Sequence, residues 1–258
     1  MVVLKTSREI SAMGEAGQIA ANALHIAGQH CISGTTTKEL DTIIKDYIRS
    51  MGATPSFFGY NGFPASACIS VNDEVIHGIP NNKTVLKDGD VVSIDVGAYY
   101  KGFHGDTAYT FQVGDVSKET KKLLDITRLC LTKAIECVKP GARIGDISHT
   151  IEMIAKQNNY GIVRQFVGHG VGQNLHEAPE VPNFGTQGRG VRLVAGMTLA
   201  IEPMINIKGD DVYVLADGWT VKTKSRGISA HFEHTVAVTP NGSEILTIPT
   251  IKGAYKCT

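Results

Sequence analysis

Two stretches of the sequence match each other at a constant offset of 107 residues. The matching positions are glycines, acids and apolar residues: Gly34 with Gly141, Glu39-Leu40 with Asp146-Ile147, Ile44 with Ile151, Gly89 with Gly196, and Ile94-Asp95 with Ile201-Glu202. Self-similarity at one fixed offset indicates an internal duplication. We therefore expect a single domain over residues 1–258, with duplicated units at roughly 7–113 and 117–240.

Each unit is predicted to contain two helices followed by strands. Helical spacing of apolar residues predicts helices over 7–30, from Thr36 to before Gly52, from Ser117 to Pro140, and from Asp146 onward. Thr36 and Glu39 form a capping box, and Ser117 and Asp146 are expected to cap the later helices. Strands are predicted at 90–96, 107–113 and 197–202, with a long turn between the first two. A pseudo-two-fold axis would bring the strand acids of both units together.

The composition excludes several classes of protein. Lys plus Arg and Asp plus Glu both number 25, so no general attraction to nucleic acid or to an anionic membrane is expected. No apolar run reaches the length of a membrane span, and Arg8 and Glu9 interrupt any signal-peptide core. The cysteines are odd in number and lack a CxxC pair: Cys31, Cys68, Cys130, Cys137 and Cys257. Reduced thiols in the cytoplasm fit this pattern.

Several carboxylates stand in unusually apolar surroundings. Asp95 lies in VVSIDVG and Glu202 in TLAIEP, and a lone buried carboxylate needs a cation or a metal. Asp106 follows Asp95 by the length of a tight hairpin, and Glu233 opens an apolar strand. The alternatives are strand-end acids that reach water or an arginine and, for Glu233, a surface pair with a neighbouring histidine.

Histidines in glycine- and proline-rich segments complete the set of candidate ligands. His169 and His176 lie in VGHGVGQNLHEAPEVPN, where glycines flank His169, and His77 lies in NDEVIHGIP. Carboxylate-rich ligation suits Mn, Fe(II) or Co(II), and bridging carboxylates suit a pair of metals about 3.5–4 Å apart. The sequence contains no GxSxG, no GxxxxGK[ST] and no HExxH.

These residues lie in stretches that resemble the type I methionine aminopeptidases of bacterial length. The stretches are NDEVIHGIP, DVVSIDVGAYYKGFHGDTAYTF, GHGVGQNLHEAP, GMTLAIEPM, DGWTVKT and SAHFEHTVAVT, and the resemblance runs from about residue 4 to residue 250. It implies an α+β pita-bread (creatinase/aminopeptidase) fold, with two pseudo-symmetric helix-helix-strand halves around a curved antiparallel sheet. The implied activity is hydrolysis of the initiator methionine from nascent chains whose second residue is small.

The resemblance also implies roles for the site residues. Asp95 would bind one metal, His169 and Glu202 the other, and Asp106 and Glu233 both. His176 would stabilise the carbonyl oxygen in the tetrahedral state, and His77 would contact the scissile amide or the N-terminal amine. Glu202 would also act as general base and acid. Two divalent ions per chain are expected, with Co, Mn and Fe(II) as the first candidates and Zn or Ni as alternatives.

An apolar pocket for the methionine side chain is expected beside His77. Its candidate walls are Tyr60, Phe63, Cys68 and Trp219. For each of the three aromatic residues, a role in the core is an equal alternative. Phe57, Phe63 and Leu175 differ from the residues usual in the family and keep the pocket apolar. A monovalent cation is implied near Asn72, Glu74 and Ser229.

The implied partners are nascent N-termini, with transient ribosome contact, no specific nucleic acid and no membrane. A cytoplasmic monomer is expected. Two other functions stay open: a prolyl peptidase of the same fold, and a binding protein that has lost enzymatic activity.

Overall fold

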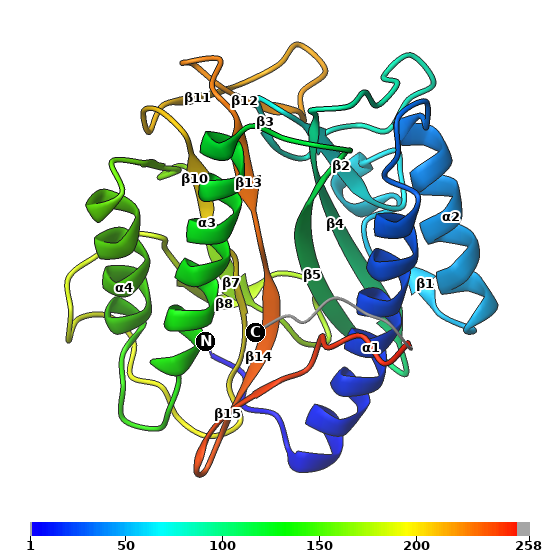
Figure 1. Ribbon diagram of the computed structural model, residues 1–258. Helices are drawn as coiled ribbons and strands as arrows, with labels where there is room; N and C mark the ends of the chain where they lie inside the picture. The colour runs from blue at the N-terminus through cyan, green and yellow to red at the C-terminus, as the bar shows by residue number, and fades with distance from the viewer. Residues whose placement is uncertain (1, 252–258) are drawn as a thin grey trace.

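The computed structural model describes residues 2–251 of the chain (Figure 1). Its helices are α1 (Ser7–Gln29), α2 (Thr37–Ser50), η1 (Tyr60–Gly62, a 3₁₀ turn), α3 (Lys118–Glu136) and α4 (Ile144–Gln157). Its strands are β1 (Thr54–Pro55), β2 (Cys68–Val71), β3 (Glu74–Ile76), β4 (Val91–Tyr100), β5 (Phe103–Gln112), β6 (Gly161–Ile162), β7 (Gly168–Gly170), β8 (Glu177–Val181), β9 (Thr198–Ile201), β10 (Met204–Asn206), β11 (Val212–Val214), β12 (Val221–Thr223), β13 (Ser229–His231), β14 (His234–Thr239) and β15 (Gly242–Ile245).

Three of the four long helices begin where the sequence predicts, whereas α4 begins before the expected position. Thr36 and Glu39 form the expected capping box of α2, and Ser117 caps α3. Asp146 is not the N-cap of α4, so that prediction was wrong: the N-cap is Arg143. Asp146 stands three residues further on, where its carboxylate accepts the Arg143 N–H at 2.8 Å. Glu39 accepts the Thr36 N–H at 2.7 Å in the same way. In both helices, therefore, an acid three residues after the N-cap accepts the N-cap N–H.

The turn between β4 and β5 is much shorter than the sequence analysis predicts. The strands are joined by Lys101 and Gly102 alone, both in the left-handed region with φ of 50° and 90°. Two consecutive positive φ angles match the twist of an antiparallel hairpin, which glycine accommodates at no steric cost. Asp106 therefore lies within a strand and not in a loop.

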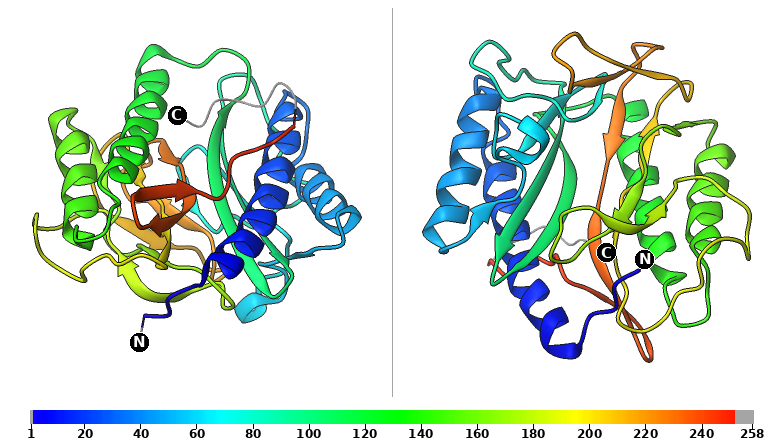
Figure 2. Two further views of the ribbon diagram at one scale, coloured as in Figure 1. Left: turned by 90° about the horizontal axis from the view of Figure 1, so that it is seen from below. Right: turned by 180° about the vertical axis from the view of Figure 1, so that it is seen from behind.

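Each pair of helices packs on its own part of the strands. Figure 1 shows α1 and α2 on one side and α3 and α4 on the other, and the view from behind in Figure 2 shows the strands in front of the helices. One core cluster joins α1 and α2 to β4 through residues such as Leu24, Ile44 and Ile94. A second cluster joins α3 and α4 to β9 through residues such as Ile147 and Leu199. The helices thus cover one face of the strands.

Backbone contacts at the start of the second helix of each pair recur at the same offset of 107 residues. Thr36 bridges to Val85 and Arg143 bridges to Arg192. The Gly34 N–H donates to the Leu86 carbonyl and the Gly141 N–H to the Leu193 carbonyl, both at 2.9 Å. We take these pairs as support for an internal duplication, which remains our hypothesis for the origin of the two halves.

The two halves meet along β5 and residues 231–235. The Glu233 N–H donates to the Ala108 carbonyl at 2.9 Å, and the Asp106 N–H donates to Thr235 Oγ1 at 3.1 Å. The Thr235 hydroxyl in turn donates to the Asp106 carbonyl at 2.8 Å. These bonds place Asp106 of the first half beside Glu233 of the second.

Residues 2–251 contain neither a membrane-spanning helix nor a disulfide. None of the helices formed by these residues is long and apolar enough to cross a membrane. Cys31, Cys68, Cys130 and Cys137 are free thiols, as expected, and Cys257 lies outside the described residues.

Gly105→Ala is expected to destabilise the protein by about 1–3 kcal/mol, because an added methyl group in a closely packed site forces the backbone to shift. A Cβ at Gly105 would meet the backbone N and Cα of Gly17 in α1, which cannot move aside as a flexible side chain would. Chemical denaturation of the purified protein measures the difference. Gly14→Ala is the control, because a Cβ there meets nothing within 4 Å and replacing a helical glycine removes a cost of about 0.5–1 kcal/mol. Equal stability of the two variants would contradict the close packing of α1 on β5.

Candidate metal centre and active site

The β4–β5 hairpin places two acids on one face. Asp95 pairs in register with Ala108, and Asp106 pairs with Gly97. Asp95 and Asp106 are therefore diagonal neighbours, a relation in which side chains of adjacent strands reach each other. Asp106 is 4% exposed and faces the same cavity as Asp95.

The second half adds two more carboxylates to this cavity. Glu202 follows β9, and its carbonyl accepts a hydrogen bond from Asn183 Nδ2 at 3.0 Å. Glu233, 2% exposed, lies across the seam from Asp106. It is not a surface carboxylate, so the alternative of an exposed pair with a histidine is wrong for this residue. The four acids and His169 all line one cavity of about 110 Å³.

His169 lies on β7 with a single defined orientation. Its Nδ1 contacts the Gly170 carbonyl at 2.9 Å, which assigns the hydrogen to Nδ1 and leaves the lone pair on Nε2. Nε2 lies 3.6 Å from Glu202 Oε1 and 3.9 Å from Asp106 Oδ2. The flanking glycines allow β7 to pack closely against its neighbouring strands and do not make room for a ligand. A Cβ at Gly168 would meet the backbone of β9, and a Cβ at Gly170 would meet the backbone of β8.

Burial and mutual repulsion leave the metal-free acids hard to ionise. Burial raises the pKa of Asp106 and of Glu202 to about 8, and the charge of Glu202 adds to the effect on Asp106. Burial, followed by the charges of neighbouring acids, raises the pKa of Asp95 and of Glu233 well above the usual range. Burial lowers the pKa of His169 to about 3, so its short contacts with the carboxylates are not ion pairs.

Three buried carboxylate oxygens of this cluster lack hydrogen-bond partners among the residues that the structure describes. Among residues 2–251, no hydrogen bond reaches Asp95 Oδ1, Asp106 Oδ1 or Glu233 Oε1, although all three atoms are buried. Ligand atoms of Asp106, His169 and Glu233 lie within 4.8 Å of one another. Because buried oxygens without donors need a cation, the residues present fit a divalent metal with oxygen and imidazole ligands.

Two other histidines face the same cavity. His176 Nδ1 contacts the Tyr60 hydroxyl at 2.8 Å, and its ring centroid lies 4.0 Å from that of His169. His77 has a left-handed backbone with φ of 58°, which is uncommon outside glycine and marks a constrained position. Burial, followed by the charges of His231 and His176, lowers the pKa of His77 to about 4. Burial also lowers the pKa of His176.

An apolar wall closes one side of the cavity. It is formed by Phe57, Tyr60, Phe63, Cys68, Leu175 and Trp219. The Phe63 and Trp219 rings meet edge to face at 5.1 Å, and the Trp219 ring lies 6.2 Å from that of His77. The structure thus brings every residue that the sequence analysis assigns to the pocket into one place.

Sequence reasoning missed His231, which touches the cluster. Its Nε2 lies 3.4 Å from Glu202 Oε2, on the opposite carboxylate oxygen from the one that faces His169. The sequence offered one signal for it, the motif SAHFEHT, in which His231 precedes Glu233 by two residues. His234, in the same motif, points elsewhere and contacts the Thr247 hydroxyl at 2.8 Å.

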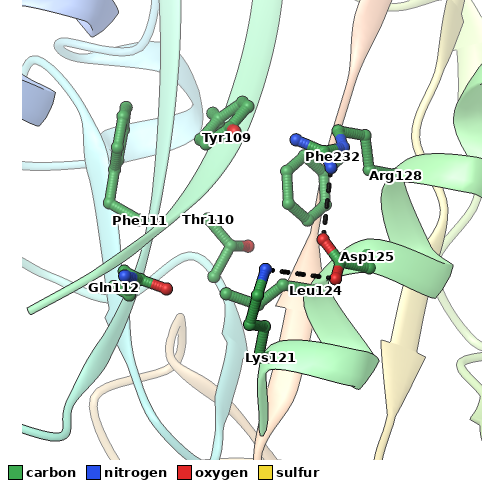
Figure 3. Close-up of a pocket in the computed structure, with 9 residues that line it drawn as sticks. All are labelled: Tyr109, Thr110, Phe111, Gln112, Lys121, Leu124, Asp125, Arg128 and Phe232. Atoms are coloured by element: carbon green, nitrogen blue, oxygen red, sulfur yellow. Dashed lines mark hydrogen bonds and ion pairs between the residues drawn. The ribbon is translucent and has the colours of Figure 1, made fainter. Parts of the chain in front are cut away.

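A second cavity, of about 270 Å³, lies between β5 and α3 (Figure 3). Lys121 and Arg128 both pair there with Asp125, at 3.3 and 3.2 Å. The two cations share one exposed carboxylate, and the lining contains no buried acid or histidine. This cavity lacks the chemistry of the first.

The family model of metallopeptidase family M24 matches residues 11–240. The chain belongs to metallopeptidase family M24. This M24 member is similar to the methionine aminopeptidase 1 of Bacillus subtilis, with 49% identity over 96% of this chain and 99% of that protein. It is 42% identical to the methionine aminopeptidase of Escherichia coli K12, over 96% of this chain and 94% of that one.

Solved structures of M24 relatives have the same fold. The methionine aminopeptidase from Thermotoga maritima aligns with a TM-score of 0.94 at 45% identity, covering 96% of this chain and 99% of that one. The prolidase from Pyrococcus horikoshii OT3 aligns with a TM-score of 0.78 at 25% identity, covering 98% of this chain and 65% of that one. The α+β pita-bread fold is confirmed. M24 membership and the cluster of Asp106, His169 and Glu233 together support use of a divalent metal.

If Asp95 ligates this metal, Asp95→Asn is expected to reduce the gain in melting temperature that metal gives. A ligand that binds only the native state stabilises it, by about 1.4 kcal/mol for each factor of ten in affinity. Thermal melts of each protein with metal and with chelator measure this gain. Asp46→Asn, on the exposed surface of α2, is the matched control. An unchanged gain in Asp95→Asn would show that Asp95 is not a ligand.

Proposed function

We propose that the protein is a methionine aminopeptidase that removes the N-terminal methionine when the second residue is small. The observation that carries this proposal is one cavity in which five ligand-type residues face an apolar wall. The residues in this cavity are Asp95, Asp106, His169, Glu202 and Glu233, beside Phe57, Phe63, Leu175 and Trp219. The metallopeptidase relatives named methionine aminopeptidase support the same substrate.

The five ligand-type residues would hold two divalent ions. We assign Asp95 to one metal, His169 and Glu202 to the other, and Asp106 and Glu233 to both. Co, Mn and Fe(II) are the first candidates, with Zn or Ni as alternatives. When bound, such ions make a water nucleophilic at neutral pH and polarise the carbonyl that it attacks.

The remaining steps belong to side chains of this chain. Glu202 would accept a proton from the attacking water and pass it to the departing amine, as general base and then general acid. The Tyr60 hydroxyl would donate to His176 Nδ1, 2.8 Å away, so that Nε2–H of His176 would stabilise the carbonyl oxygen as it gains charge. Neutral His77 would contact the scissile amide or the N-terminal amine.

The substrate side chain would enter the apolar wall. Phe63 and Trp219 form a rigid edge-to-face pair there, and Cys68 adds a polarisable sulfur suited to a thioether. The substrates would be N-termini of nascent chains, met in transient contact with the ribosome by a cytoplasmic monomer. A monovalent cation near Asn72, Glu74 and Ser229 is part of the same proposal, and the Ser229 N–H already donates to the Asn72 carbonyl at 2.9 Å.

The test compares a Met-Ala-Ser peptide with an Ala-Pro peptide, each with and without chelator. Cleavage of the first peptide, lost with chelator, supports the proposal. Cleavage of the second instead would indicate a prolyl peptidase, the activity named for more distant structural relatives. No cleavage of either peptide by metal-loaded protein would indicate a binding protein.

A further inference from the structure

A buried ion pair joins the N-terminal segment to the loop that carries His176. Lys5 Nζ lies 2.6 Å from Glu177 Oε2, and the two side chains are only 3% and 7% exposed. Burying two charges is costly unless further hydrogen bonds satisfy them. Both groups have such bonds: Lys5 Nζ also donates to the Val3 carbonyl, and Glu177 Oε1 accepts the Asn174 N–H, each at 3.1 Å.

The Glu177 carboxylate closes the loop in which His176 lies. Besides the bond from Asn174, the Gly172 N–H donates to the Asn174 carbonyl at 3.0 Å, so residues 172–177 fold over this carboxylate. Gly172 packs directly on the ion pair, because a Cβ there would lie 2.6 Å from Lys5 Cε. From the other side, the His176 ring contacts the Tyr60 hydroxyl.

The backbone of Lys5 is itself fixed to the second half. Its N–H donates to the Gly196 carbonyl at 2.8 Å, just before β9, the strand that leads to Glu202. One lysine therefore touches both the segment that leads to a candidate ligand and the loop that carries the candidate oxyanion donor. The backbone of Lys5 thus contacts one of these elements, and its side chain contacts the other.

We propose that Lys5 is a positioning residue that holds the His176 loop in place through Glu177. The kinetic part of this inference rests on the proposed function. Lys5 lies outside the cavity and would act only through the placement of His176. A displacement of about 1 Å is enough to lower turnover roughly 100-fold.

Lys5→Met is expected to lower kcat on a Met-Ala-Ser peptide about 10- to 100-fold, with KM changed less than about 3-fold and metal content unchanged. In a His176→Ala background the same substitution should change kcat less than about 3-fold, because residues that act as one unit are not additive. Lys101→Met is the control: Lys101 forms a 2.7 Å pair with Glu15 on the exposed surface, and its loss should leave kcat unchanged.

An equal loss of kcat in both backgrounds would overturn the proposal, because Lys5 would then act independently of His176. Unchanged kcat in Lys5→Met would overturn it as well. If Lys5→Met does not fold, Lys5→Met combined with Glu177→Gln replaces it, since the double variant leaves no unpaired buried charge. The double variant should show the same kcat loss, and wild-type kcat in it would contradict the proposal.

Hydrogen exchange provides a readout that does not depend on activity. The peptide covering residues 172–177 should exchange faster in Lys5→Met than in the wild type, and equally fast in Lys101→Met and the wild type. If the wild type cleaves no peptide, the proposed function fails while exchange still decides whether Lys5 holds the loop. Unchanged exchange in Lys5→Met would overturn the positioning role.

Discussion

Removing divalent metal is expected to lower hydrolysis of a Met-Ala-Ser peptide by at least roughly 10³-fold, since metal activation of water is worth several kcal/mol. The physical reason is the cluster itself: Asp95, Asp106 and Glu233 present buried oxygens that no described residue satisfies. Mn, Fe(II) or Co(II) added to the chelated protein should restore activity. Full activity after verified removal of metal would contradict the assigned mechanism.

Metal binding should also release protons at pH 7. The pKa of Asp106 and of Glu202 is about 8 in the metal-free site, so both are mostly protonated at that pH and must lose protons to ligate. The affinity for metal should therefore rise with pH until the pH exceeds the pKa of these two groups. Titration calorimetry in buffers of different ionisation enthalpy counts the protons, and a count of zero at pH 7 would argue against both ligands.

His176→Ala is expected to lower kcat about 100- to 1000-fold, the usual cost of losing one donor to a developing oxyanion. The hydrogen bond from His176 to the carbonyl oxygen strengthens only in the transition state, so its loss should change KM little. Metal content should stay near that of the wild type, because the His176 ring is oriented by the Tyr60 hydroxyl and not by the carboxylates.

His169→Ala is the matched comparison, since His169 lies on β7 with its ring centroid 4.0 Å from that of His176. This variant should lose metal, because Nε2 of His169 faces Glu202 and Asp106 with a free lone pair. The test measures the metal content and the steady-state kinetic constants of both variants. Loss of metal from His176→Ala with full metal in His169→Ala would reverse the two roles.

Local patterns in the sequence predict the helices well, since caps and apolar periodicity depend on residues only a few positions apart. Thr36 with Glu39 and Ser117 illustrate this, as each cap forms with a partner three residues away. The predicted cap at Asp146 was wrong because an acid satisfies the first turn equally well from the third helical position. The long turn predicted between β4 and β5 was wrong, because most of that segment continues the two strands: Gly105, for example, lies in β5 against the backbone of α1.

The candidate site could be predicted as a set of residues, because acids in apolar strands are recognisable from their neighbours and the motifs resemble a known family. Asp95 and Glu202 stand out in this way in VVSIDVG and TLAIEP. The sequence could not show that Glu202 lies between two imidazoles, since His231 is distant from His169 in the chain.

The sequence by itself predicted the type of fold through its family resemblance, the order of the four long helices and of β4, β5 and β9, and the acids and histidines that share one cavity. Only the tertiary structure decided how close they lie, which oxygens lack donors and how Lys5 reaches Glu177. The reason is that periodicity reports which face of an element is buried, whereas contacts across the seam between β5 and residues 231–235 depend on how two halves dock. Asp106 meets Glu233 through that docking, which no local pattern encodes.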